Sequence, residues 1–113
     1  MPAPFETTKV HVSRRDEVVY LIMRGELDHE DWEDVEAAWQ AADRSGLSAT
    51  TVDLSQVTFA DSMLLNALLT ARRHHLATGR ELVLLGPLQP PVRRLLDVSG
   101  TLGHFTTQNM DTD

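Results

Sequence analysis

Apolar residues in this chain alternate between two spacings, and this alternation constrains the fold more than any other feature. Nearly continuous apolar runs at Val18 to Met23 and Leu82 to Leu85 are typical of buried strands. Over residues 29–45, 62–78 and 90–98, apolar residues instead recur every three or four positions, as in helices with one buried face. Strands that alternate with helices predict a mostly parallel sheet joined by right-handed crossovers.

An antiparallel hairpin is expected at one edge of that sheet. Lys9 to Ser13 alternates apolar and polar residues, and the polar turn 14–17 connects it to the apolar run at 18–23. Thr50 to Leu54 adds a short strand, and Val57 to Ala60 a further β segment before the second helix. We therefore predict an α/β domain with a mixed, mostly parallel sheet of four to five strands, packed by about three to four helices.

The helical spacing also predicts which side chains are buried. In the first helix, which we expect to end at Gly46, the predicted core stripe is Trp32, Val35, Trp39 and Ala42. In the second helix, the predicted stripe is Leu65, Leu68, Leu69 and Leu76.

Length and composition indicate one small domain. The chain has 113 residues, enough for a single domain over 1–113 with an ordered core at about 8–106. Loose ends are expected at Met1 to Pro4, which has two prolines, and at the polar Thr106 to Asp113. The chain has no cysteine, no secretory pattern and no apolar run long enough for a bilayer, so we expect a cytoplasmic protein without a membrane partner. Its formal charge of −7 argues against nucleic-acid binding.

Catalytic and metal-binding patterns are missing from the sequence. The five histidines do not form a metal-ligand spacing, and neither a nucleophile–base pattern nor a cofactor motif is present, so we expect no enzyme and no cofactor. The run Arg72 to His75 is interpreted as a solvated helix face, with a basic docking patch as the alternative. Asp53 could suggest a phospho-accepting aspartate at a strand end, but the acidic cluster that usually accompanies one is missing.

Ser62 stands at the junction between the β segment and the second helix. One interpretation is structural: Asp61 or Ser62 caps the helix by accepting hydrogen bonds from its free N–H groups. The other is regulatory: a hydroxyl at a helix start is accessible to phosphorylation, and the helix dipole tolerates the added negative charge. A phosphate there would leave the fold intact and act by repulsion at a partner surface.

Four segments in order resemble the STAS domain family, in particular its stand-alone anti-sigma factor antagonists. The resemblance covers about residues 10–105, and the segments that carry it are Gly25 to Asp28, Val52 to Ser62, Gly79 to Leu84 and Val92 to Gly100. It implies a protein that binds an anti-sigma factor of kinase-like ATPase fold and so releases a sigma factor for transcription.

The resemblance also implies the site. In that family the serine after the aspartate is phosphorylated by the anti-sigma factor, which ends binding, and Ser62 occupies this position. The implied partner-binding residues are Gly25, Glu26, Leu27, Asp28, Asp61, Ser62, Met63 and Leu64.

The chain departs from the family directly after this serine. The family usually continues with a small hydroxylic residue, glycine and leucine, whereas here Met63 and Leu64 add apolar bulk where a partner would approach. The alternative is therefore a STAS subunit that is not phosphorylated and serves as a structural or regulatory component of a transporter or stress-signalling complex. For the oligomeric state, a monomer or a weak dimer is expected.

Overall fold

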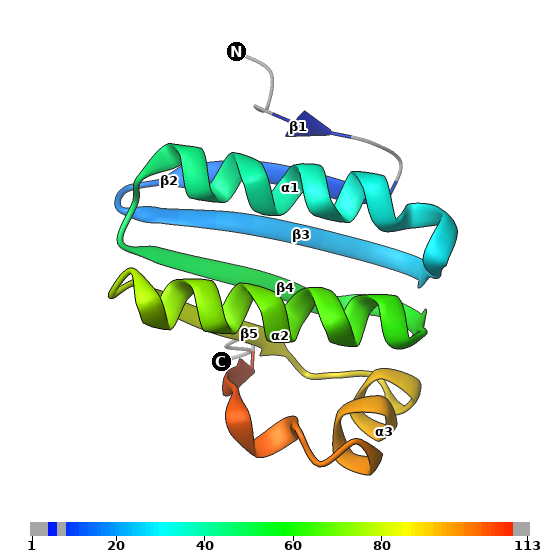
Figure 1. The fold of residues 1–113 in the computed structure, drawn as a ribbon. Coiled ribbons are helices and arrows are strands. Elements are labelled where there is room, and N and C mark those ends of the chain that lie inside the picture. Colours follow the sequence, from blue (N-terminus) through cyan, green and yellow to red (C-terminus); the bar gives the residue numbers. More distant parts are fainter. Residues whose placement is uncertain (1–4, 7–8, 110–113) are drawn as a thin grey trace.

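The computed structural model describes residues 5–6 and 9–109, which form one sheet with helices packed on it (Figure 1). The strands are β1 (Phe5–Glu6), β2 (Val10–Arg15), β3 (Val18–Leu27), β4 (Ala49–Ala60), β5 (Glu81–Gly86) and β6 (Thr106–Asn109). The α-helices are α1 (Trp32–Ser45), α2 (Ser62–Ala77) and α3 (Pro90–Val98), and two 3-10 turns are η1 (His29–Asp31) and η2 (Leu102–His104).

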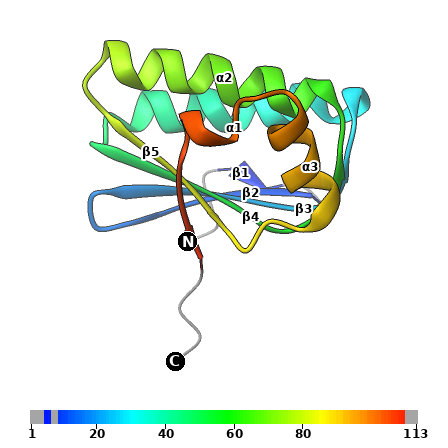
Figure 2. The same cartoon turned by 90° about the horizontal axis from the view of Figure 1, so that it is seen from below.

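The strands lie in the sheet in sequence order, from β1 to β6. The pairs β1–β2 and β2–β3 are antiparallel, and the pairs from β3 to β6 are parallel, so the predicted α/β class and hairpin are confirmed. Each crossover moves one strand further in the same direction, and right-handed connections then place all three helices on one face (Figure 2). No helix in the described part of the chain is long and apolar enough to span a bilayer.

This one-sided layer explains the burial of β3. The apolar run at 18–23 predicts a strand buried on both faces. In the structure Val19, Leu21 and Met23 are buried beneath the helices, whereas the residues between them are only partly covered. The open face of the sheet has no helix, so its side chains stay in partial contact with solvent (Figure 2).

β4 runs without a break from Ala49 to Ala60, where the sequence predicts a strand that ends at Leu54 and a separate segment. The Asp53 carboxylate accepts hydrogen bonds from the backbone N–H and the hydroxyl of Ser55, at 2.9 and 2.6 Å. The register against β3 shifts at this point by one extra residue in β4, which is a β-bulge. Asp53 thus has a structural role: it holds the bend that lets β4 continue to the site.

Both predicted helical stripes need correction. Trp39 is buried, but Trp32 keeps 48% of its surface exposed. In α2 the inward face carries Leu64, Leu68, Ala71 and His75, whereas Leu76 is 64% exposed. Packing against the sheet determines which face of α2 is buried. The buried face is turned around the helix axis by about one residue position from the predicted face.

The C-terminal region also differs from the expectation of a loose end. Thr106–Asn109 forms β6, which pairs in parallel with β5 from Val83 to Gly86. All four side chains of β6 are exposed, so backbone hydrogen bonds hold this strand and no apolar pattern marks it. The expected loose ends at 1–4 and 110–113 lie outside the described residues.

His75 is buried at 1% exposure, which overturns the interpretation of Arg72 to His75 as a fully solvated face. Its Nδ1 lies 2.7 Å from the Ala71 carbonyl, which can only accept, so Nδ1 donates. Its Nε2 then accepts from the Thr50 hydroxyl at 2.8 Å. Burial lowers the pKa of His75 below its usual range, against the Ala71 hydrogen bond, which raises it.

The lowered pKa predicts a pH-dependent stability. Below pH about 6.5 the unfolded chain protonates His75 while the folded chain does not, so the free energy of unfolding falls as the pH drops through that window. His75→Gln should lower this free energy by about 1–3 kcal/mol at pH 7.5, because buried hydrogen bonds are lost. It should also flatten the decrease between pH 7.5 and 5.5, as measured by urea unfolding.

The control is His104→Gln, since the His104 side chain is exposed. This variant should keep the pH dependence of the wild-type protein. If the free energy of unfolding fell equally between pH 7.5 and 5.5 in the wild-type protein and in His75→Gln, His75 would not be the cause of the pH dependence.

Candidate functional site

The predicted site residues come together at one edge of the sheet. β3 and β4 are parallel neighbours that end side by side, with Leu27 opposite Ala60. The backbone N–H of Asp61 donates to the Leu27 carbonyl at 3.3 Å. The segment after β3 and the start of α2, which lie far apart in the sequence, thus form one continuous surface.

The Asp61 carboxylate holds this surface together. Its Oδ1 accepts from the Met63 N–H at 2.9 Å, which makes Asp61 the N-cap of α2. Its Oδ2 accepts from the His29 N–H at 3.0 Å, so the same side chain joins α2 to the turn after β3. The two interpretations of the Asp61–Ser62 pair are therefore separated, because Asp61 is the cap.

Ser62 is left as the first residue of α2, with an exposed side chain. Its hydroxyl makes no hydrogen bond to any other described residue. Neither capping nor packing occupies this hydroxyl, so it is accessible to a modifying enzyme. A group attached to it would project from the helix N-terminus without displacing a structural contact.

The turn after β3 is ordered by its own caps. Asp28 Oδ1 accepts from the Glu30 N–H at 2.9 Å, and Asp31 Oδ2 accepts from the Asp28 N–H at 3.0 Å. Lys9 Nζ binds Asp31 Oδ2 at 3.1 Å and the Glu26 carbonyl at 2.6 Å. Asp28 therefore has a structural task, with part of its surface still exposed.

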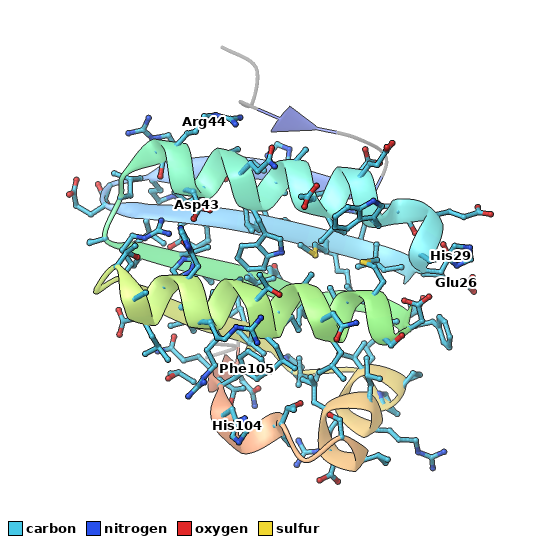
Figure 3. All side chains as sticks on the ribbon, in the orientation of Figure 1. Glu26, His29, Asp43, Arg44, His104 and Phe105 are labelled. Carbon is cyan, nitrogen blue, oxygen red and sulfur yellow. The ribbon has the colours of Figure 1, made fainter. Side chains whose placement is uncertain are left out.

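Gly25 lies at the second register shift between β3 and β4. Its φ is +80°, a conformation that favours glycine, and the register against β4 shifts between Gly25 and Glu26. The strand beyond it presents the exposed Glu26 side chain. Figure 3 shows Glu26 and His29 together near the starts of α1 and α2, with Asp43 at the opposite end of α1.

Two predicted partner-binding residues do not reach the surface. Leu27 and Leu64 are both fully buried, because Leu27 lies under the helices and Leu64 lies one turn before Leu68 on the inward face of α2. Their side chains support the surface from beneath. Met63 is partly exposed. Of the two residues that depart from the family pattern, Met63 and Leu64, it is therefore the one that a partner could contact.

Two aromatic residues beside the site are exposed although the sequence pattern does not predict it. They are Phe59 and Trp32, at 47% and 48% exposure. Phe59 is exposed because the pairing of β4 with β5 stops at Asp53 and leaves the rest of β4 without a strand on that side. The pattern of apolar and polar residues in β4 does not predict that Phe59 is exposed. Phe59 borders an apolar groove of about 740 Å³ that Pro90, Pro91, Leu95 and Val98 of α3 also line.

Within residues 5–6 and 9–109, no group of three or more histidine, aspartate or glutamate side chains could hold a metal ion. His74 lies 3.6 Å from Asp43, which also pairs with Arg80 at 2.6 Å, and this cluster ties the end of α1 to the start of β5.

The double role of Asp61 predicts its effect on stability. Asp61→Ala should lower the free energy of unfolding by about 1–2 kcal/mol, because the Met63 and His29 N–H groups lose their acceptor. Asp97→Ala on α3, where the exposed carboxylate has no hydrogen bond with the described residues, should change it by less than about 0.5 kcal/mol. Urea unfolding measures both; equal effects of the two variants would contradict the role of the two Asp61 contacts, which we call the Asp61 clamp.

Comparison with known proteins identifies the family and similar folds. The family model described as "Mlab, STAS domain" matches residues 10–105. The sequence finds no match among curated proteins. A solved structure of the anti-sigma factor antagonist SpoIIAA in its unphosphorylated form is 22% identical, over 90% of this chain and 88% of its own, with a TM-score of 0.77.

Two further structures are similar. The Bacillus cell fate determinant SpoIIAA in its phosphorylated form is 24% identical, over 90% of this chain and 91% of its own, with a TM-score of 0.72. An anti-sigma factor antagonist from Mycobacterium paratuberculosis is 25% identical, over 95% of this chain and 89% of its own, with a TM-score of 0.78. Since the family model spans most of its length, the chain belongs to the STAS domain family.

Proposed function

We propose that this chain is an anti-sigma factor antagonist that binds a kinase-like anti-sigma factor, releases a sigma factor and is switched off by phosphorylation of Ser62. The main support for the proposal is that Asp61 and Ser62 have different roles at the start of α2. Asp61 caps the helix and fastens the turn after β3, and Ser62 is exposed with its hydroxyl unused. The similarity to anti-sigma factor antagonists supports the same role.

The proposed switch acts through charge. A phosphate adds about −1.5 to −2 charges at pH 7. The surface around Ser62 already carries the carboxylates of Glu26, Asp28 and Asp61, and the charge contact of Asp61 within the described residues is His29, at 4.0 Å. A phosphate there would add to these negative charges, so it would repel an acidic partner surface and exclude close approach.

The chain itself has no catalytic step in this proposal. The phosphoryl group comes from the kinase-like partner and ATP, and the chain contributes the acceptor hydroxyl. The partner-binding surface consists of Gly25, Glu26, Asp28, Asp61, Ser62 and Met63, with Leu27 and Leu64 supporting it from the core. We place this function in the cytoplasm, where sigma factors act on transcription.

A second candidate is a STAS subunit of a transporter or stress-signalling complex that needs the same surface but no phosphate. Met63 favours it, because this side chain stands next to Ser62 and belongs to an apolar groove between α1 and α2. Affinity purification separates the candidates. Recovery of a transporter ATPase in place of an anti-sigma factor would favour the second one.

The switch predicts one phosphorylation site. Incubation with the anti-sigma factor and ATP should add a single phosphate, on Ser62 as located by mass spectrometry, and Ser62→Ala should remove it. Ser62→Asp should weaken binding to that partner at least about tenfold in Kd, equivalent to about 1.4 kcal/mol, as measured by calorimetry.

The matched control is Ser48→Asp, since Ser48 is exposed before β4, at the opposite end of the sheet. It adds the same charge to the chain and should leave Kd within about twofold. The switch model fails when no phosphate appears on Ser62 and Ser62→Asp binds as tightly as wild type. If the chain binds a partner through this surface but is not phosphorylated, the partner-binding surface is still supported, and the result favours the second candidate function.

A further inference from the structure

An apolar groove of about 620 Å³ lies between α1 and α2, on the side of the helices away from the sheet. Its floor and walls include Trp32 and Trp39 from α1 and Met63, Ala67 and Ala71 from α2. This volume is in the range of small-molecule sites, which are mostly apolar with a few polar groups that fix orientation. The small side chains of Ala67 and Ala71 leave the space open on the α2 side.

Each of the two tryptophans of the groove lacks an interaction that a buried tryptophan normally has: Trp32 lacks full burial, and Trp39 lacks a hydrogen-bond acceptor among the described residues. Trp32 has the helical spacing of a core residue, yet it is 48% exposed. The Nε1–H of Trp39 is buried and has no hydrogen-bond acceptor among the described residues. A buried indole N–H usually has a partner, so the Trp39 ring lacks one contact that buried tryptophans normally make.

The charge beside the aromatic rings selects the class of ligand. Glu36 lines the groove one turn after Trp32, so the two side chains are neighbours on the same face of α1. His29 and His74 lie at the groove as well, and no lysine or arginine lines it. An indole ring next to a carboxylate is the arrangement that attracts an organic cation, because both the ring face and the carboxylate are negative.

We propose that this groove binds a small organic cation with an apolar body, such as a quaternary ammonium compound. The charged end lies between Trp32 and Glu36, and the apolar body lies along Ala67 and Ala71 toward Trp39. The groove begins at His29 and Met63, next to the surface around Ser62, but the proposal needs no protein partner and is tested on the chain alone.

The probe is (3-hydroxyphenyl)trimethylammonium, with 3-tert-butylphenol as its neutral isostere of equal shape. Two-dimensional NMR at pH 7, where the phenols of both compounds are mostly un-ionised, follows the indole N–H signals of the two tryptophans of the chain. We expect saturable shifts of both indole signals with the cation, and a Kd at least about fivefold higher for the neutral compound. Trp32→Ala assigns the signals and should abolish saturation.

Glu36→Gln isolates the charge without changing the shape of the groove. It should raise the Kd of the cation at least about fivefold, whereas Glu33→Gln, an exposed position of α1 outside the groove, should leave it within about twofold. Equal affinity for both compounds, or no effect of Glu36→Gln, would overturn the cation site. The absence of saturable indole shifts up to about 10 mM probe would overturn the groove as a binding site.

Discussion

The carboxylate of Asp61 is the interaction on which the site depends. One oxygen caps α2 through Met63, and the other binds the backbone of His29. Two segments that meet only because β3 and β4 end at the same edge of the sheet are thereby fixed relative to each other. Since the Asp61 side chain accepts the hydrogen bonds from both segments, the hydroxyl of the neighbouring Ser62 is not needed for capping.

The path of the two strands makes this contact possible. The bulge held by Asp53 and the left-handed Gly25 change the register of β3 against β4 twice before the strands end. Without these irregularities the two strand ends would not bring Leu27 opposite Ala60. The same bend carries β4 past the end of its pairing with β5, which leaves Phe59 exposed beside the site.

The sequence predicts the fold class because its apolar spacing changes cleanly between strand and helix. It predicts the boundaries of α2 and α3 well, because Asp61 and Pro90 mark their starts. It misplaces the inward face of α2, since leucines surround the helix and only the sheet decides that Leu64, and not Leu65 or Leu76, is fully buried. β6 is held by backbone hydrogen bonds, and side chains alone cannot reveal it.

The meeting of the two candidate segments follows from the predicted parallel strands, but the role of each residue does not follow from the sequence. The sequence allows either Asp61 or Ser62 as the cap, and the distances assign it to Asp61. Leu27 and Leu64 are predicted at the partner surface, but both are buried. The spacing predicts Trp32 in the core, because spacing cannot distinguish a stripe that packs on the sheet from one that borders a groove. The local environment, and not the residue type, decides each of these roles.

In the proposed switch, phosphorylation of Ser62 changes the surface and leaves the Asp61 clamp closed. Amide hydrogen exchange of the chain before and after phosphorylation tests this most directly. The N–H groups of Met63 and His29 should remain protected to a similar degree in both forms. A large rise in exchange at these two positions in the phosphorylated form would show that the phosphate opens the clamp, and would contradict it.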